Sequence, residues 1–138
     1  MGSTLPVLLV TPVLAHPGSA IISNGTAQMG VWDEGRLNVP GGVASPEGTL
    51  TTGLRFVPTG NEATGAGCLC ESWGVGEIIS SVAGYANEAT DGVVNLAVES
   101  FVSDGDSATS LTLVKDVADV NVMRVTHDYQ PAAAAANL

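Results

Sequence analysis

The chain has 138 residues, which fits a single domain with one hydrophobic core. Its net charge of −10 leaves only four lysine and arginine residues against 14 acidic ones, so a phosphate backbone or an anionic membrane surface would find no cluster of cations to contact. We therefore expect no nucleic-acid partner. Hydrophobic residues make up 45% of the chain and charged residues 13%, with 17 glycines, a composition typical of a β-rich protein.

Residues 1–19 form an apolar N-terminal segment. Its length and its Val13-Leu14-Ala15 ending suit a signal peptide, but no lysine or arginine precedes Arg36. The alternative is an extended strand that packs on a neighbouring subunit in an assembly. The segment is too short to span a membrane as a helix, which needs about 20 apolar residues. The side chains of this candidate assembly segment are Leu5, Val7, Leu8, Leu9, Val10, Val13 and Leu14.

The first half of the main region reads as short strands joined by turns. Asn24-Gly25 suits a tight hairpin turn, because both residue types tolerate positive φ. Asp33-Glu34-Gly35 is a glycine-containing loop between Val31-Trp32 and the strand Arg36–Val39. A further short strand is expected from Thr52 to Val57, ending at a proline.

The stretch from Gly67 to Gly76 contains the two cysteines of the chain, Cys68 and Cys70. In a strand, residues two apart point to the same side, so both thiols would face one way. His16 and His127 complete the ligand types of a zinc site, but they lie far away in sequence and no second closely spaced ligand pair exists. The sequence thus predicts a packing pair or a disulfide, and no metal site.

The second half carries longer strand patterns. Glu77–Ala86 is ambiguous by periodicity, and its glycines and β-branched residues favour a strand. The clearest strand runs from Val93 to Val102, and two more are expected over Thr109–Val114 and Val120–Tyr129. Residues 131–138 form an alanine-rich tail.

Turn signals recur along residues 20–130 at the spacing of sandwiches and barrels, and no helix–strand alternation is visible. The predicted fold is therefore all-β: an antiparallel β-sandwich over residues 20–130, with jelly-roll and immunoglobulin-like topologies both open. A strand from a neighbouring subunit is expected as a further element of the sandwich, because the chain stops after a strongly patterned strand.

Acid–base chemistry finds weak support in the sequence. His127 and Asp128 are adjacent, but adjacent residues of a strand point to opposite faces, so Asp128 would not orient the imidazole. No serine stands in a Gly-x-Ser-x-Gly context. We expect no catalytic residues and no enzyme activity.

Calcium is the cofactor alternative that the acidic loops leave open. Asp104-Gly105-Asp106, together with Asp33-Glu34 or with Glu88 and Asp91, would supply loop oxygens. Acidic turns are also ordinary, because Asp and Gly suit turn geometry. No cofactor is therefore predicted, with calcium as the alternative.

Three aromatic residues are candidates for ligand stacking: Trp32, Trp73 and Tyr85. Aromatic side chains stack on sugar faces in carbohydrate-binding sandwiches. With aromatics making up only 4% of the chain, burial as core anchors is the competing interpretation.

Three segments together resemble an uncharacterised family of exported bacterial β-sandwich proteins that carry a GCLCExWGV-type motif. They are Ile22–Thr26 leading to Gly35–Gly41, the motif itself at Gly67–Val75, and Arg124–Pro131. The resemblance covers most of Ile21 to Leu138. It implies an extracellular β-sandwich, and it implies that related chains continue with further strands. It assigns no catalytic residues.

These observations predict a secreted structural protein at the cell surface or outside the cell. We expect a subunit of surface-layer or filament type that forms a homo-oligomer or polymer, with the N-terminal segment or the tail supplying a strand to a neighbour. A carbohydrate-binding module that uses the three aromatics is the alternative.

Overall fold

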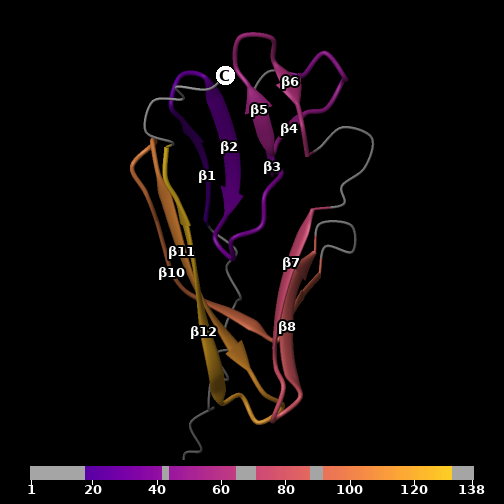
Figure 1. The fold of residues 1–138 in the computed structure, drawn as a ribbon, viewed down its shortest axis with the longest axis vertical. Helices are drawn as coiled ribbons and strands as arrows, with labels where there is room; N and C mark the ends of the chain where they lie inside the picture. The colour runs from indigo at the N-terminus through magenta and orange to yellow at the C-terminus, as the bar shows by residue number, and fades with distance from the viewer. Residues whose placement is uncertain (1–17, 42–43, 65–70, 88–91, 132–138) are drawn as a thin grey trace, which may run out of the picture.

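The computed structural model describes residues 18–41, 44–64, 71–87 and 92–131 (Figure 1). Within these ranges the regular structure is all β-strand, and every strand pairing is antiparallel. The predicted all-β, antiparallel character is confirmed. The candidate assembly segment, Cys68, Cys70 and the tail from residue 132 lie outside the described residues, and their predicted roles stay predictions.

The described strands form several small sheets. One sheet has the order β1-β2-β5-β6, a second β10-β11-β12, a third β7-β8-β9, and β3 pairs with β4. The strands are β1 Ser19–Ser23, β2 Ala27–Trp32, β3 Val39–Pro40, β4 Thr51–Thr52, β5 Leu54–Phe56, β6 Asn61–Glu62, β7 Ser72–Glu77, β8 Val82–Asn87, β9 Gly92–Val94, β10 Leu96–Ser103, β11 Ala108–Lys115 and β12 Asn121–Tyr129.

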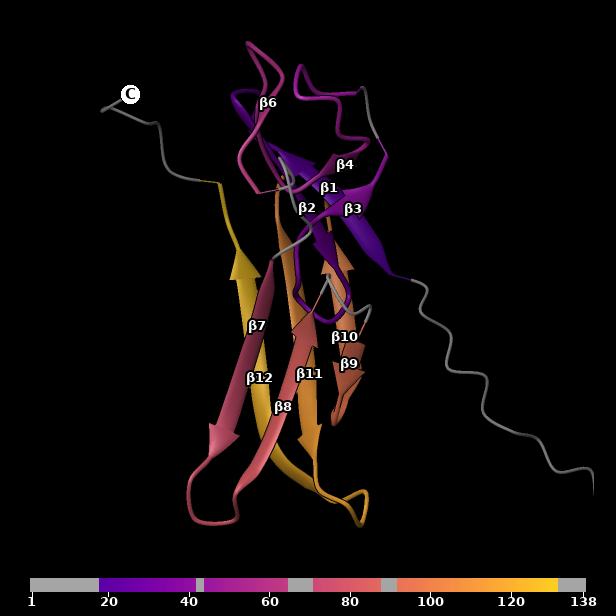
Figure 2. The ribbon, with the colours of Figure 1, turned by 90° about the vertical axis from the view of Figure 1, so that its right-hand side faces the viewer.

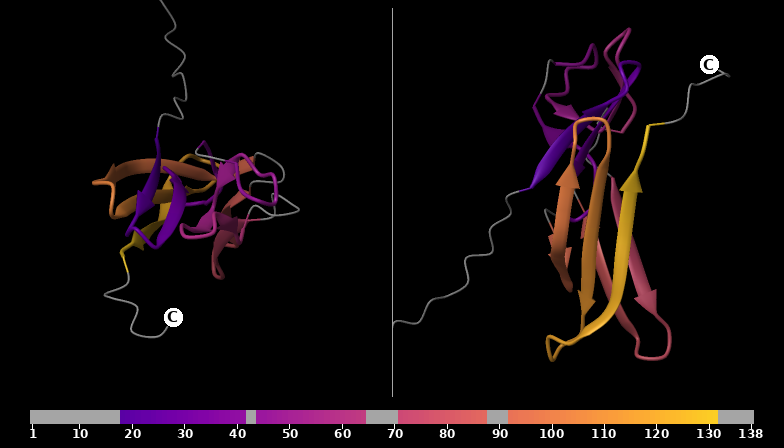
Figure 3. Two further views of the ribbon diagram at one scale, coloured as in Figure 1. Left: turned by 90° about the horizontal axis from the view of Figure 1, so that it is seen from above. Right: turned by 90° about the vertical axis from the view of Figure 1, so that its left-hand side faces the viewer.

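The β10-β11-β12 sheet has the longest strands and one well-covered face. Along β11 burial alternates residue by residue: Ser110 and Thr112 are buried, whereas Leu111 and Leu113 are only half-buried. This alternation follows from the period of two in a strand. The inner face of the sheet, which is drawn as a ribbon in Figure 3 (right), is therefore partly polar. By the alternation of burial along β11, Leu111 and Leu113 belong to the outer face.

Two smaller sheets pack on that inner face at opposite ends. At one end Ile22 and Val31 of the β1-β2 hairpin form the core with Ala108, and Phe101 and Tyr129 pack against it. At the other end β8 lies so close to the long sheet that a Cβ on Gly84 would approach Leu96 to 2.6 Å. The long sheet thus spans both smaller sheets, as Figures 1 and 2 show.

The predicted continuous strand from Val93 to Val102 is wrong, because the chain divides at Asn95 into β9 and β10, which belong to different sheets. Asn95 adopts a left-handed conformation with φ of 56°, and its side-chain amide donates to the Ala83 carbonyl at 2.8 Å. A bulge after Val98 then shifts the register, so Val102 lies on the face opposite to Val98. Periodicity alone shows neither a corner nor a bulge.

Glu77–Ala86 is likewise not one strand. β7 ends at Glu77, residues 78–81 form a turn, and β8 begins at Val82. The Glu77 carboxylate accepts hydrogen bonds from the Ile79 and Ser80 amides at 3.0 and 2.5 Å, which closes the turn. By contrast, the predicted turn at Asn24-Gly25 is confirmed, with Gly25 at φ of 84° between β1 and β2.

Candidate functional site

The turn after β2, residues Asp33 to Arg36, is buried although three of its four residues are charged. It closes a hairpin: the Gly35 amide donates to the Trp32 carbonyl at 2.9 Å, and the Trp32 amide donates to the Arg36 carbonyl at 2.8 Å. Gly35 has φ of 90°, in the left-handed region that favours glycine. The predicted loop is therefore present, but it lies inside the molecule and not on its surface.

Three consecutive carbonyls of this turn each accept a side-chain hydrogen bond from a different strand. Ser110 of β11 donates to the Asp33 carbonyl at 2.5 Å, and Trp73 of β7 donates to the Glu34 carbonyl at 3.0 Å. Tyr129 of β12 donates to the Gly35 carbonyl at 2.5 Å. Buried carbonyls need such partners, so the turn joins the first hairpin to two other sheets.

The charges of the turn are largely compensated locally. The Glu34 carboxylate, 1% exposed, forms an ion pair with the Arg36 guanidinium, which lies 5.1 Å above the centre of the Trp32 ring. Burial, and next the neighbouring Asp33 side chain, raise the pKa of Glu34 to about 7. The proton occupancy of Glu34 therefore changes near neutral pH.

Glu71, just before β7, is a third carboxylate beside the turn. Its Oε2 accepts a hydrogen bond from the Leu37 amide at 2.8 Å. Burial raises its pKa, while the Leu37 amide and the charge of Arg36 oppose the rise. Burial, and then the charge of Glu71, raise the pKa of Tyr129 to about 12, so this hydroxyl is a stable donor to Gly35.

His127 lies in the same cluster, packed against Trp73 with ring centres 4.5 Å apart and stacked with Tyr129 at 6.2 Å. Burial lowers its pKa. The Asp128 carboxylate instead accepts hydrogen bonds from Thr109 at 3.1 Å and from Gln130 at 2.7 Å. His127 and Asp128 are therefore not brought together as an acid–base pair, as expected for neighbours on a strand.

Another buried carboxylate, Glu62, stabilises the β5-β6 hairpin. It accepts backbone hydrogen bonds from Gly53 at 3.1 Å and Leu54 at 2.7 Å, and forms an ion pair with Arg55 at 3.5 Å. Burial alone would raise its pKa, but the backbone amides that it accepts from outweigh burial and lower it. This group stays charged and structural.

Calcium was the alternative for several acidic turns, and in one of them, Asp104-Gly105-Asp106, the Asp104 carboxylate is used within the turn. Asp104 Oδ1 accepts hydrogen bonds from the Asp106 amide at 3.1 Å and the Ser107 amide at 2.8 Å, which lowers its pKa. Glu88 and Asp91 lie outside the described residues. Among the residues that the structure describes, no group of three or more His, Cys, Asp or Glu side chains could hold a metal ion.

The three candidate stacking aromatics do not share a surface. Trp73 is half-buried with its indole committed to Glu34, and the Trp32 indole donates to the Asn38 carbonyl at 3.3 Å. Tyr85 is 43% exposed. It pairs with Gly74, whereas Trp73 pairs with Ala86, so the two rings project from opposite faces of the β7-β8-β9 sheet. Carbohydrate stacking stays a prediction for Tyr85.

The most unusual surface feature is a set of aliphatic side chains on two hairpin turns. Ile78 and Ile79 in the β7-β8 turn are 92% and 95% exposed, and Val117 in the β11-β12 turn is fully exposed, with Val120 beside it. Both turns lie at the same end of the molecule (Figure 2). We call these four residues the apolar tips. The sequence analysis assigned Ile78 and Ile79 to a strand, although Ser80-Ser81 directly after them is a turn signal.

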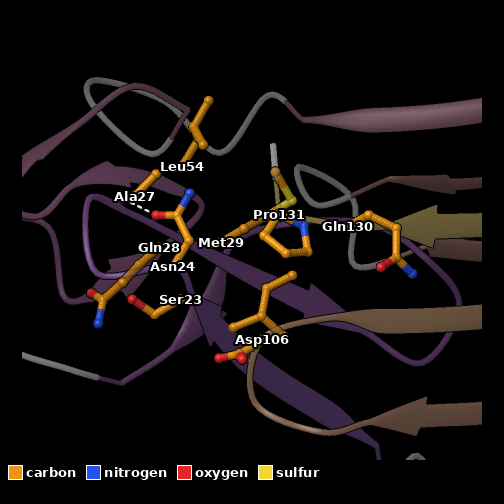
Figure 4. A pocket seen from close by; sticks show the side chains of 10 residues that line it. Ser23, Asn24, Ala27, Gln28, Met29, Leu54, Asp106, Gln130 and Pro131 are labelled. Carbon is orange, nitrogen blue, oxygen red and sulfur yellow. Dashed lines mark hydrogen bonds between the residues drawn. The ribbon is translucent and has the colours of Figure 1, made fainter. Parts of the chain in front are cut away.

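Near the opposite end, two adjoining hollows share Ala27 and Leu54. One, of about 220 Å³, also includes Ile22, Met29 and Pro131 (Figure 4). The other, of about 330 Å³, includes Phe56 and Ala63. Amide side chains that contribute to the lining are Asn24, Gln28, Asn61 and Gln130. We call the two hollows together the apolar groove.

The comparisons add no relative to these observations: no family model, no curated protein and no solved structure matches the chain. Among the described residues, no helix is long and apolar enough to cross a membrane. The candidate surfaces therefore rest on the geometry of this chain.

Proposed function

We propose that the chain is an extracellular structural β-sandwich subunit that assembles with copies of itself. The observation that carries the proposal is the set of apolar tips. Soluble domains expose single aliphatic residues at random, but four of them on two turns at one end indicate a contact surface. Burying such side chains is favourable by about 1.5–3 kcal/mol each.

The turns hold these side chains in place without help from a partner. Glu77 accepts hydrogen bonds from the Ile79 and Ser80 amides, and Asp116 accepts them from the Ala118 and Val120 amides at 2.8 and 2.9 Å. The acidic groups are thus directed at their own turns. A preorganised apolar surface loses little conformational entropy on binding, which favours association.

The sandwich is part of the proposal. The long β10-β11-β12 sheet would be one layer, and the β1-β2-β5-β6 and β7-β8-β9 sheets would together be the second, interrupted layer. In the described part of the chain no strand pairs with the free edges of β10 and β12. A strand donated by the segment Leu5–Leu14 of a neighbour would add to such an edge by β-augmentation. The resemblance to exported proteins supports the extracellular location.

The test is the molar mass of the full chain by light scattering across a wide concentration range. We expect the mass to rise with concentration, and to rise further with salt because copies of net charge −10 repel one another at low ionic strength. A variant without residues 1–15 cannot donate the N-terminal strand, so any rise in mass that it retains would come from the apolar tips. A chain that stays monomeric at all concentrations and salt levels would refute the proposed function.

A further inference from the structure

We propose that the Ile78-Ile79 tip of one copy docks into the apolar groove of the next, so that copies add head to tail. This inference rests on the proposed function and names the two surfaces that it needs. One surface is convex, aliphatic and almost fully exposed; the other is concave, with an apolar floor of Ala27, Leu54 and Phe56. They lie toward opposite ends of the molecule (Figures 1 and 2).

The groove has room for the tip. The volume of about 330 Å³ in one hollow is many times the roughly 10–15 Å³ that a single water molecule needs in the same measure. The two isoleucine side chains together carry eight carbon atoms. The adjoining hollow, seen in Figure 4, extends the same floor past Leu54 towards Met29, which leaves space for the neighbouring turn residues.

Electrostatic repulsion is weaker when the tip of one copy contacts the groove of another than when two tips contact each other. Each pair of turns carries Glu77, Asp116 and Asp119, with Lys115 paired to Asp119 at 2.8 Å, so two tips in contact would bring together two regions of net charge −2 each. Part of the groove lining consists instead of uncharged amides such as Asn24, Gln28 and Asn61. Its charged residues are Asp106 and the ion pair of Glu62 with Arg55, which leaves a net charge of −1. Two convex surfaces would also bury less area than a convex surface in a concave one.

The size of the contact fits a polymer better than a closed dimer. The two turns at the tips comprise ten residues, Glu77–Ser81 and Asp116–Val120, fewer than the 20–30 residues a side of a stable dimer. A contact between two different surfaces does not close on itself unless its rotation forms a ring, so it extends as a filament. Each single contact is then weak, and assembly appears only at high concentration.

The experiment uses the full chain and two variants that remove one surface each. Ile78→Ser with Ile79→Ser removes the tip, and Phe56→Ser removes part of the groove floor. Ala63→Gln, which fills the groove from an exposed position, covers the case in which Phe56→Ser perturbs the hairpin. Val102→Ser, an exposed aliphatic outside both surfaces, is the matched control, and circular dichroism melting checks that every variant is folded.

We expect the tip variant and both groove variants to weaken association at least about tenfold by light scattering, and Val102→Ser to leave it unchanged. The decisive measurement is a mixture of the tip variant with a groove variant. Each alone stays monomeric, and the mixture reaches the mass of a dimer and no more, because one intact tip meets one intact groove.

Other results separate the failure of the inference from the failure of the proposed function. A groove variant that associates like the unaltered chain, or a mixture that stays monomeric, overturns the inference and leaves self-assembly standing. An unaltered chain that never associates overturns both. An unaltered monomer that sediments with phosphatidylcholine vesicles through its intact tip also overturns both, since the tip would then bind lipid.

Discussion

Two kinds of turn depart from the usual rule that polar residues are exposed and apolar residues are buried. The turn at Asp33–Arg36 buries charged residues, and the turns with the apolar tips expose aliphatic ones. The buried turn is charged: its carbonyls accept hydrogen bonds from β7, β11 and β12, and its Glu34 carboxylate pairs with Arg36 of the same turn. The exposed turns are aliphatic, and their side chains stand in solvent. The buried turn thus has its partners within the fold, and the exposed turns are the ones for which we propose a partner outside the single copy.

Turn chemistry does not require the apolar tips. The turns after β1 and β10 are closed by Asn24 and Asp104, which accept backbone amides as Glu77 and Asp116 do, yet their remaining residues are polar or glycine. The capping residue sets the turn, and the residues between are free to vary. Isoleucine at 78 and 79 is therefore not needed for folding.

The largest expected effect concerns Gly35. Its φ of 90° disfavours a side chain, and a Cβ there would approach His127 Nδ1 to 2.5 Å. We expect Gly35→Ala to lower the free energy of unfolding by about 3 kcal/mol, from backbone strain plus overpacking. Gly25→Ala is the control, because Gly25 has φ of 84° but nothing within 4 Å, and should cost about 1–2 kcal/mol in urea melts. Equal losses would mean that His127 does not confine the turn.

The second prediction concerns the proton on Glu34. Its folded pKa of about 7 lies above the ordinary 4.5, so the unfolded state ionises first as pH rises, and the contribution of Glu34 to stability is lost between pH 4.5 and 7. We expect the difference in unfolding free energy between the unaltered chain and Glu34→Gln to fall by about 2.5 kcal/mol from pH 5 to pH 8.

Taking this difference cancels the opposite contribution of His127, whose lowered pKa favours the folded state at higher pH. Val102→Ser, which removes an exposed side chain without a titratable group, serves as the control and should show no such trend. A flat difference for Glu34→Gln would show that Arg36 keeps the Glu34 carboxylate ionised throughout.

A smaller effect is expected for Tyr129→Phe. The substitution keeps the ring stacked near His127 but leaves the Gly35 carbonyl without its donor. We expect a loss of about 1.5 kcal/mol in denaturant unfolding, the usual cost of an unsatisfied buried acceptor. A loss below about 0.5 kcal/mol would mean that water replaces the hydroxyl, and that the turn is less enclosed than described.

The smallest effect on the single copy is expected at the apolar tips. Ile78→Ser with Ile79→Ser should change the melting free energy of the monomer by no more than about 0.5 kcal/mol, because neither side chain is buried. Thermal unfolding at the lowest usable concentration measures this. A clear destabilisation would mean that the apolar tips stabilise the fold, as the buried turn does, and the two kinds of turn would no longer differ in role.

The sequence predicted β11 and β12 of the long sheet well, because burial alternates along all eight residues of β11 and from Met123 to Tyr129 in β12. The sequence pattern did not predict the points at which a strand ends at a corner or shifts its register. The corner at Asn95 and the bulge after Val98 depend on single backbone conformations. The buried position of Asp33–Arg36 was also out of reach, since its partners Ser110 and Tyr129 lie far along the chain and polar turns are normally exposed.

The hydrogen-bond partners of the Asp33–Arg36 turn also affect when the chain can fold. Its carbonyls are satisfied by residues 39, 77 and 94 positions away along the chain, the last of them on the final described strand. Contacts at such sequence separation slow folding, because long loops must close before the contacts form. The Gly35 carbonyl therefore lacks its donor until Tyr129 has been synthesised. We expect the chain to complete its folding only after the last described strand is available.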